Sequence, residues 1–580
     1  MEQFHLLASA EFQTLDWITI VVYFVIIAGI SVWSVKQGLK SSTDYFLAGR
    51  HMPWFVIGAS IFASNIGSEH IVGLAGQGAT SGMAMAHWEL HAWVVVLLAW
   101  VFVPFYYRSK VFTMPEFLER RFNPTARWIL SIVSLVAYVF TKVSVTVYAG
   151  GVVFNVLLPE IHLEVGNFVL DAFWLGAILT VVFTGIYTII GGLRAVVYTD
   201  TMQTIVLLIG SAFITYFGLS KLGGWGELQE IARQNAENFA LWRPNTDPDF
   251  PWLGVLIASP IIGIWYWCTD QYIVQRVLSA KDLKTARRGA LWGAFLKVWP
   301  VMIFIIPGLI GYALFQKGMI DTPLKTVAGQ QVVDGDRVFA VMVTSLLPVG
   351  LRGLVVAGLL AALMSSLSSL FNSCATLFTV DIYEKINPRA SERHLVTVGR
   401  VVTVFVVIMG LIWIPVMQRV SQGGLYQYLQ SVQGYLAPPI TAVFLLGLFF
   451  KRINGKGAVS GLLIGFIAGM FKLTVQAMTG GENPAITSPG WLVYIGEYNF
   501  LFATGWLLLL SIIVVVGVSM LTAPPNYEKI AELTYSTVSA GQREENRNSW
   551  GVTEVIMTIV VLGLVLGIYL YFSHFNFWLK

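Results

Sequence analysis

The chain has 580 residues, of which 56% are hydrophobic and only 12% carry a charge. Soluble domains average about 25% charged residues, so this composition, with a mean hydropathy of +0.71, excludes a soluble protein and predicts many membrane spans. The net charge of +4 does not indicate a nucleic-acid partner, because the Lys and Arg residues cluster in predicted loops on one side of the membrane. Cys268 and Cys374 lie in hydrophobic segments without metal-ligand spacing, and we interpret them as packing thiols.

Windows of about twenty apolar residues predict an all-α membrane protein with fourteen transmembrane helices. Their approximate limits are 16–34, 53–79, 83–107, 127–157, 170–190, 196–218, 252–274, 287–316, 352–383, 394–418, 424–450, 457–479, 500–521 and 552–576. The first fifteen residues lack the basic stretch and the cleavage site of a signal peptide, so the first hydrophobic segment is expected to remain in the protein.

An even number of spans places both termini on the same side. With the termini outside, the predicted cytoplasmic loops and helix ends hold most of the 36 Lys and Arg residues, as the positive-inside rule requires. Two longer hydrophilic connections, 219–250 and 317–351, are then expected to cover an outer vestibule, and the polar segment Pro524–Gly551 is expected to be a cytoplasmic linker. No usable Asn-x-Ser/Thr glycosylation acceptor occurs, which fits a bacterial inner membrane.

The stretch Phe62–Gly73 interrupts the second span with Ser, Asn, Gly, Glu and His residues, which lipid cannot solvate. Polar groups inside a bilayer are costly and usually face a cavity or a binding site, often where a helix is broken. We therefore predict a broken helix and a substrate and ion site here.

A second break is predicted at Ser259–Gly263, five spans after the first. A Pro-Gly kink alone is weak evidence, because such kinks are common in membrane helices. Two interrupted helices five spans apart are what an inverted five-plus-five repeat predicts, with a binding site between them near the midplane.

A third polar group lies in the segment Ala361–Ser373. Helical spacing places Ala362, Ser365, Ser366 and Ser369 on one face. Their oxygens suit a hard cation such as sodium, but spacing alone favours a small-residue packing face with hydroxyls bonded to their own helix, and only further evidence could overturn that interpretation.

Several charged residues fall too deep in predicted spans to be ignored, and each is a functional-site hypothesis. They are Glu69, Glu89, Lys142, Asp200, Asp270 and Lys297. Two alternatives stay open: Asp200 could compensate a helix dipole at the start of its span, and Lys142 could pair with a carboxylate for structural reasons only.

The chain resembles the sodium/glucose cotransporters of the solute:sodium symporter family. The segments that carry the resemblance are Ala63–His70, Thr113–Phe117, Gly191–Leu193 with Tyr198–Asp200, Trp265–Gln271, Leu363–Ser373 and Ala442–Gly447. The resemblance implies a LeuT-like ten-helix transport core at 53–450, preceded by a tail and an extra helix at 1–52 and followed by three helices and a linker at 451–580.

The resemblance also implies the site residues. The main Na⁺ site would use backbone oxygens of Ala63, Ile66 and Ala362 and hydroxyls of Ser365 and Ser366, and a second Na⁺ site would use Asp200, Ser368 and Ser369. A sugar would contact Asn65, His70, Glu89, Tyr266, Trp267, Lys297 and Gln430. Gates would be formed by Leu74, Trp88 and Tyr426 on the outside and by Tyr266 on the inside.

The function implied is symport of two Na⁺ with a hexose such as glucose or galactose by alternating access. His91 and Gln433 depart from the pattern of the glucose carriers near the sugar site, so another polyol such as inositol or an amino sugar stays open. A carboxylate substrate is disfavoured because no unpaired Arg is expected in the pocket. A membrane sensor without transport or a sodium channel is a further alternative. An enzyme is not expected, since no zinc motif, nucleophile elbow or P-loop occurs.

Overall fold

The computed structural model describes residues 12–36, 41–158, 162–165, 168–327, 330–420, 425–479 and 485–573. Among these residues, twelve helices are long and apolar enough to cross a membrane, and one bent helix pair makes a thirteenth span. One of the twelve, α11 (Ala172–Leu222), has 51 residues and is interrupted at Gly192, where φ is 56° and ψ is −157°. Its 51 residues make about 75 Å of helix in total at 1.5 Å per residue, enough for two of the predicted spans, one on each side of Gly192. In the described part of the chain, each of the fourteen predicted windows is mostly helical.

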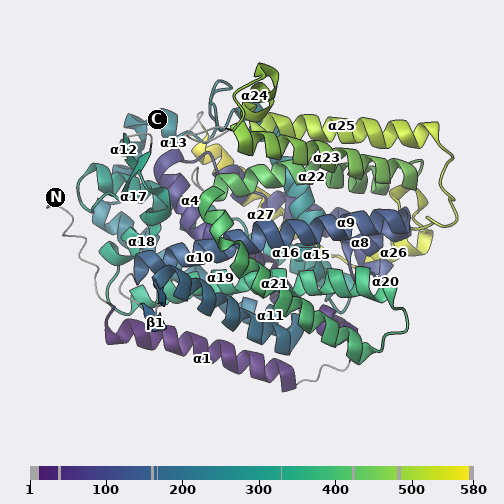
Figure 1. Cartoon of the computed structure of the whole chain (residues 1–580), viewed down its shortest axis with the longest axis horizontal. Helices are drawn as coiled ribbons and strands as arrows, with labels where there is room; N and C mark the ends of the chain where they lie inside the picture. The colour runs from purple at the N-terminus through teal and green to yellow at the C-terminus, as the bar shows by residue number, and fades with distance from the viewer. Residues whose placement is uncertain are drawn as a thin grey trace.

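The helices run roughly side by side along the long axis of the molecule (Figure 1). In the first part of the chain they are α1 (Thr14–Lys36), α2 (Ser42–Leu47), η1 (Ala48–Arg50), α3 (Trp54–Asn65), α4 (Ser68–Ser81), α5 (Ala86–Glu89), α6 (Ala92–Leu97), η2 (Leu98–Phe102), α7 (Val103–Ser109), α8 (Met114–Arg121), α9 (Pro124–Ala137), η3 (Tyr138–Val143), α10 (Ser144–Leu157), α11, α12 (Trp225–Gln234) and α13 (Ala236–Phe239).

The second part of the chain continues the bundle. It holds α14 (Trp252–Gly263), η4 (Ile264–Thr269), α15 (Gln271–Leu278), α16 (Leu283–Leu296), η5 (Val301–Ile305), α17 (Ile306–Gln316), α18 (Gly335–Leu346), α19 (Leu351–Thr376), η6 (Leu377–Tyr383), α20 (Glu384–Ile386), α21 (Glu392–Val420), α22 (Leu425–Phe449), α23 (Gly455–Thr479), α24 (Gly490–Glu497), α25 (Phe500–Leu521), η8 (Tyr535–Thr537), α26 (Ala540–Asn548) and α27 (Val552–Phe572).

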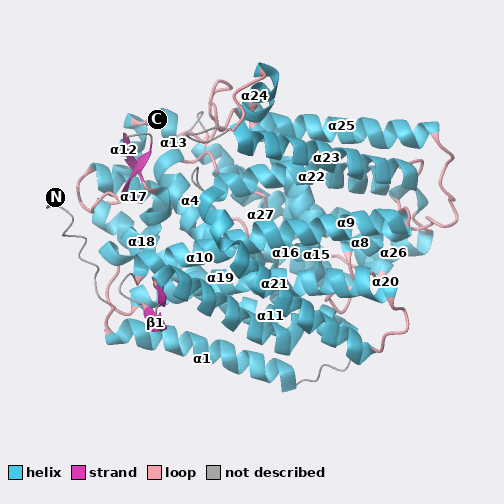
Figure 2. Cartoon of the chain, viewed as in Figure 1, coloured by secondary structure: helices cyan, strands magenta, loops and turns pink. Residues whose placement is uncertain are grey.

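Helix α3 packs against α11, α16 and α19, and α11 packs against α19. Helices α1 and α25 lie at opposite edges of the molecule (Figure 1). Two short antiparallel hairpins lie at one end of the bundle, drawn in magenta in Figure 2. They are β1 (Leu163–Val165) with β2 (Phe168–Leu170), in register Leu163↔Leu170, and β3 (Leu324–Val327) with β4 (Gln330–Val333), in register Leu324↔Val333.

The two hydrophilic connections are more structured than their composition suggested. The first contains α12 and α13, and the second contains the β3–β4 hairpin and α18. Helix α12 forms because one face buries Leu228 and Ile231 while the other face stays polar.

The predicted first break is confirmed. Helix α3 ends at Asn65, the backbone leaves helical geometry at Ile66 (φ −91°, ψ 98°) and Gly67 (φ −96°, ψ 178°), and α4 follows. The axes of Trp54–Asn65 and His70–Ser81 differ by 56°. The predicted stretch therefore provides a helix end inside the membrane.

The second break exists, but its predicted position at Ser259–Gly263 is wrong. Helix α14 continues through Pro260 into the π-helical segment η4, and the chain leaves helical geometry only at Asp270 (φ −79°, ψ 126°). The Asp270 side chain accepts a hydrogen bond from the Tyr272 backbone N–H and so caps α15. A new helix begins at this cap, whereas α14 continues through Pro260 without ending.

Helix α4 packs against η5 and α17 at backbone contact distance. A Cβ atom added at Gly308 would lie 2.0 Å from the Ala75 carbonyl oxygen, and one at Gly78 would lie 2.4 Å from the Ile305 carbonyl oxygen. These glycines allow the second half of the broken helix to approach α17 closely, as small residues do at helix contacts in membranes.

We expect Gly308→Ala to destabilise the protein by about 1–3 kcal/mol, the usual cost of overpacking a tight contact. The measurement is the thermal unfolding midpoint of the purified protein in detergent. Gly563→Ala in α27 is the matched control, because nothing lies within 4 Å of its added Cβ and alanine favours a helix. Equal midpoints for Gly308→Ala and the wild type would contradict the close packing.

Candidate functional site

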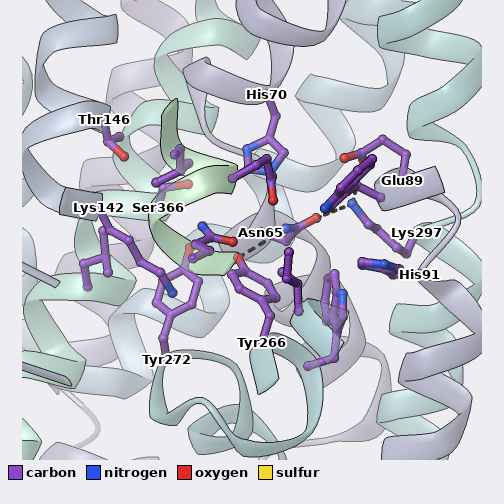
Figure 3. Close-up of a pocket in the computed structure, with 17 residues that line it drawn as sticks. Asn65, His70, Glu89, His91, Lys142, Thr146, Tyr266, Tyr272, Lys297 and Ser366 are labelled. Carbon is purple, nitrogen blue, oxygen red and sulfur yellow. Dashed lines mark hydrogen bonds and ion pairs between the residues drawn. The ribbon is translucent and has the colours of Figure 1, made fainter. Parts of the chain in front are cut away.

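A buried polar cavity lies beside both helix breaks (Figure 3). It is lined by Asn65, His70, Trp88, Glu89, His91, Lys142, Thr146, Ile262, Tyr266, Trp267, Tyr272, Lys297, Ser366, Leu370, Leu429, Gln430 and Gln433. All seven side chains predicted to contact a sugar are in this set, although they come from five separate stretches of the chain. His91 and Gln433, the two departures from the glucose-carrier pattern, also line it.

A chain of hydrogen bonds crosses one side of the cavity. The Lys297 ammonium lies 2.6 Å from Glu89 Oε2 and 2.6 Å from Asn65 Oδ1, and the Asn65 amide donates to the Tyr266 hydroxyl at 3.2 Å. Lys297 and Glu89 are each 1% exposed, so each charge depends on the other for compensation. The network fixes the end of α3 relative to α16 and η4.

A second buried ion pair joins Lys142 of η3 to Asp270 at the second break. The Lys142 Nζ atom lies 2.6 Å from Asp270 Oδ2, and the Tyr138 hydroxyl also donates to Asp270. The ammonium lies 4.6 Å from the ring centroids of both Tyr266 and Tyr272. The structural pairing foreseen for Lys142 is therefore present, and the same side chain lines the cavity.

Two polar groups at the cavity have no hydrogen-bond partner among the described residues. They are the indole N–H of Trp88 and the side-chain carbonyl oxygen Oε1 of Gln430, both fully buried atoms. Buried polar groups are nearly always hydrogen-bonded in native proteins. One unused donor and one unused acceptor at one cavity are suited to a ligand that both donates and accepts hydrogen bonds.

The residues predicted for the main sodium site come together at the end of α3. The Ser365 hydroxyl of α19 lies 2.7 Å from the Ala63 carbonyl oxygen and 3.0 Å from the Ala362 carbonyl oxygen, and Ser366 lies 3.3 Å from the Ser64 carbonyl oxygen. Ile66, the fifth predicted member, is the residue at which α3 ends. Neutral oxygens gathered in this way are the donor set that a hard monovalent cation requires.

The second predicted sodium set comes together only in part. Asp200 Oδ2 accepts from Ser60 at 2.5 Å and from Ser64 at 3.5 Å, and Ser64 and Ser369 hydroxyls are 2.8 Å apart. The Ser368 hydroxyl instead donates to the Ser365 carbonyl at 3.0 Å. The other Asp200 oxygen, Oδ1, is buried without a partner among the described residues. Asp200 also lies two turns past Gly192, too far for a helix-end dipole effect.

Arg276 is the residue at this cluster that the sequence did not indicate, because it was grouped with the cytoplasmic charges. It is fully buried in α15, where its guanidinium donates to Ser369, to the Tyr272 carbonyl and to Ser60 (3.4 Å). Ser60, one turn before Ser64 on α3, was also missed. The only signal was the spacing of four residues between these two serines, which is common in membrane helices.

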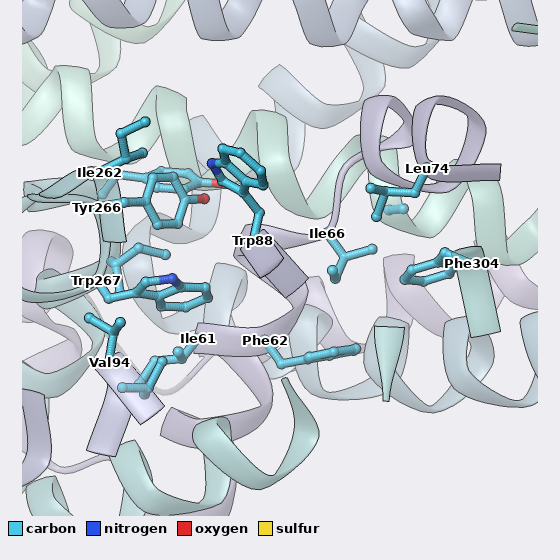
Figure 4. Close-up of a cluster of buried hydrophobic side chains, with 14 of the residues drawn as sticks. Ile61, Phe62, Ile66, Leu74, Trp88, Val94, Ile262, Tyr266, Trp267 and Phe304 are labelled. Carbon is cyan, nitrogen blue, oxygen red and sulfur yellow. The ribbon is translucent and has the colours of Figure 1, made fainter. Parts of the chain in front are cut away.

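The predicted gate residues differ in position. Trp88 and Tyr266 line the cavity. Leu74 is fully buried and lies near Ile66 and Phe304, away from the lining (Figure 4). The side chain of Tyr426 lies outside the described residues, as does that of Glu69.

Some lining residues were not predicted as sugar contacts. They are Thr146, Ile262, Tyr272, Leu370 and Leu429, together with Lys142. Among these residues, only Lys142 could have been identified as a cavity residue from sequence, because it is a lone charge in an apolar span. Tyr272 follows the second break directly, and correct placement of that break would have indicated it.

Two membrane helices broken beside one buried polar cavity, with oxygens gathered at the broken ends, define a secondary transporter with a LeuT-like core. Residues 45–465 match the sodium:solute symporter family. The chain belongs to this family. It is therefore a sodium:solute symporter and not an enzyme, as the motifs predicted.

Two kinds of relative have similar identity to this chain. Sodium/glucose cotransporter 4 of Danio rerio is 37% identical, covering 94% of this chain and 84% of that protein. Sodium/myo-inositol cotransporter 2 of Sus scrofa is 38% identical, covering 90% of this chain and 79% of that protein. A solved Na⁺-coupled sialic acid symporter in a substrate-bound, outward-open state has the same fold, with a TM-score of 0.72 and 22% identity over 89% of this chain and 100% of that one.

We expect Lys142→Met and Asp270→Asn each to destabilise the protein by about 3–5 kcal/mol, because each leaves one buried charge without its partner. Asparagine retains the helix cap. The double variant should be more stable than either single variant, since no uncompensated charge remains. Thermal unfolding midpoints of the four proteins test this coupling, and additive losses in the double variant would contradict it.

Proposed function

We propose that this symporter couples the inward flow of two Na⁺ to uptake of a hexose such as glucose or galactose by alternating access. The observation that carries the sugar assignment is the pair of unused groups at the cavity, the Trp88 N–H donor and the Gln430 Oε1 acceptor. A sugar hydroxyl both donates and accepts, so a polyol can satisfy both groups. Lys297, Glu89 and Asn65 then supply further charged and amide partners around the same ring.

Sodium at the main site would bind between the end of α3 and α19, where Ala63, Ile66, Ala362, Ser365 and Ser366 supply oxygens. Ser366 also lines the sugar cavity, and Asn65, two residues past Ala63, holds Lys297. Bound sodium therefore steadies the residues that contact the sugar. Coupling follows if sodium binds one conformation more strongly than the other.

The second sodium would bind at Asp200 and Ser369, with Ser368 one residue away on α19. The free Asp200 oxygen Oδ1 supports this assignment. Arg276 already donates to the hydroxyl oxygens of Ser369 and Ser60. A sodium ion at this position would need lone pairs of the same hydroxyl oxygens, and its charge would repel the guanidinium. Sodium entry at this position therefore displaces Arg276.

We place the transport core at 53–450 and assign both termini to the outer side of a bacterial inner membrane. The distribution of the 36 Lys and Arg residues supports this orientation. Inside-negative voltage adds about 2.3 kcal/mol per charge per 100 mV, which drives accumulation of the sugar.

The second candidate substrate is myo-inositol, because the inositol relative is as similar to this chain as the glucose relative. His91, whose Nε2 atom lies 2.8 Å from the Ser259 hydroxyl, and Gln433 stand at the cavity where this chain departs from the glucose carriers. They are the residues to exchange if inositol is preferred.

For the substrate, we expect sodium-dependent uptake of glucose or galactose by proteoliposomes that contain the purified protein. Gln430→Leu and Trp88→Phe should each raise the half-saturating sugar concentration about 5- to 150-fold. Each substitution leaves one hydroxyl of the bound sugar buried without its hydrogen-bond partner, at a cost of about 1–3 kcal/mol. Trp491→Phe, at a residue 61% exposed, is the control. Uptake of inositol but no hexose would reverse the choice of substrate, and no sodium-dependent uptake would contradict the proposed function.

For the ions, reversal potentials should give two charges per sugar in the wild type and one in Asp200→Asn. Arg276→Gln should keep the ratio at two and lower the half-saturating sodium concentration, because a competing cation is gone. Asp171→Asn is the matched control on the same helix, since Asp171 is the exposed cap of α11 and asparagine caps equally well. A wild-type ratio of one would exclude the second site.

A further inference from the structure

Helix α1 lies outside the transport core and is fixed at its first turn by one buried carboxylate. Asp16 is 0% exposed. Its Oδ1 atom accepts from the backbone N–H groups of Gly350 (2.7 Å) and Gly353 (3.0 Å), and its Oδ2 atom lies 3.2 Å from Arg352. This clamp joins the start of α1 to the start of α19. Further along, Tyr23 contacts α19 and α11, where its hydroxyl accepts from Gln203 at 3.2 Å.

Beside these contacts, a cavity lies between α1 and the helices α10, α11 and α19. Fourteen side chains line this cavity, and their polar groups are the Thr180 hydroxyl and the indole N–H of Trp17. None of them carries a charge. Trp17, Ile20 and Phe24 of α1 form one wall, and Leu360 and Met364 of α19 form the floor. We call this space the α1 cavity.

The α1 cavity opens sideways onto the surface that faces lipid. Its lining residues Leu179, Trp17 and Phe183 are 53%, 38% and 36% exposed, whereas the floor residues Leu360 and Met364 are 5% and 1% exposed. Helices α1 and α11 also expose the apolar side chains of Val21, Val25, Val182 and Ile186. In a membrane, the medium at this opening is hydrocarbon.

We propose that the α1 cavity binds one acyl chain of a bilayer phospholipid. Water is poorly held there, because each water molecule needs two to four polar partners and the whole lining offers one hydroxyl and one indole N–H. A free fatty acid would bring a carboxylate, for which the lining has no cation. A phospholipid keeps its headgroup at the membrane surface and inserts only the chain, which matches the lining and the lateral opening.

The bound chain would contact the helix that carries the proposed sodium ligands. Met364 directly precedes Ser365, and the Met364 carbonyl oxygen accepts from the Tyr187 hydroxyl at 3.0 Å. The acyl chain therefore fills the space behind the serine face of α19. This gives α1 a role that the transport core alone does not require: it forms the outer wall of a lipid site.

The test uses the full-length protein in nanodiscs of phosphatidylcholine that carries a diazirine in one acyl chain. After illumination, mass spectrometry of peptides should find label on the floor segment Val356–Met364, which bulk lipid does not touch, and on α1. No label on this floor segment in the wild type would overturn the proposal.

Leu360→Trp and Val153→Phe fill the cavity from two different helices and should lower floor labelling at least about fivefold. Label on the exposed face of α23, at Leu463 and Ile467, should stay constant in every protein. Leu463→Trp is the matched control and should leave floor labelling unchanged. Unchanged floor labelling in folded filling variants, or floor labelling by a diazirine fatty acid but not by the phospholipid, would also overturn the proposal.

Discussion

The structure depends on one constraint, the need to satisfy backbone polar groups where α3 ends inside the membrane. A helix end leaves carbonyl groups without partners, and lipid cannot supply any. Here the hydroxyls of Ser365 and Ser366 on α19 donate to the Ala63 and Ser64 carbonyls. The break is therefore stable only while α19 lies against it. The Ala63 carbonyl oxygen and the hydroxyls of Ser365 and Ser366 also belong to the proposed sodium site, so a bound cation would replace part of the contact that holds the broken helix against α19.

The buried charges are likewise satisfied by partners within the protein. Lys297 with Glu89, and Lys142 with Asp270, are pairs whose members come from distant parts of the chain. Ion pairs of this kind contribute little net stability compared with apolar packing, but loss of one partner is costly. They persist beside the cavity because they hold polar side chains in fixed positions around a site that must exclude lipid.

Much of the fold was accessible from sequence, because hydropathy and length determine spans in a membrane. The first break was visible as Ser, Asn and Gly residues in an apolar run. The second was placed about ten residues too early, since Pro260 is a strong local signal, whereas the break at Asp270 depends on Lys142, 128 positions away. The cavity residues came from family resemblance. Ser60 and Arg276 were missed because their role arises only when α3, α11, α15 and α19 meet.

The short helix α15 lies between the cavity and the polar cluster around Asp200. Its cap, Asp270, is held by Lys142 at one end, and Arg276 in its last turn is held by Ser60 and Ser369 at the other. Movement of α15 relative to α3 requires the Arg276 contacts to break or to be replaced, and Gln275 adds a further contact to Thr376 of α19. A cation that binds Asp200 would compete for the Arg276 contacts only, and would leave the Lys142–Asp270 pair intact. Ion binding at Asp200 would thus loosen the Arg276 contacts in the last turn of α15, where Gln275 still donates to Thr376 and to the Phe46 carbonyl, while the first turn borders the cavity through Tyr272. The proposed ion site at Asp200 and the cavity are therefore joined through this one eight-residue helix.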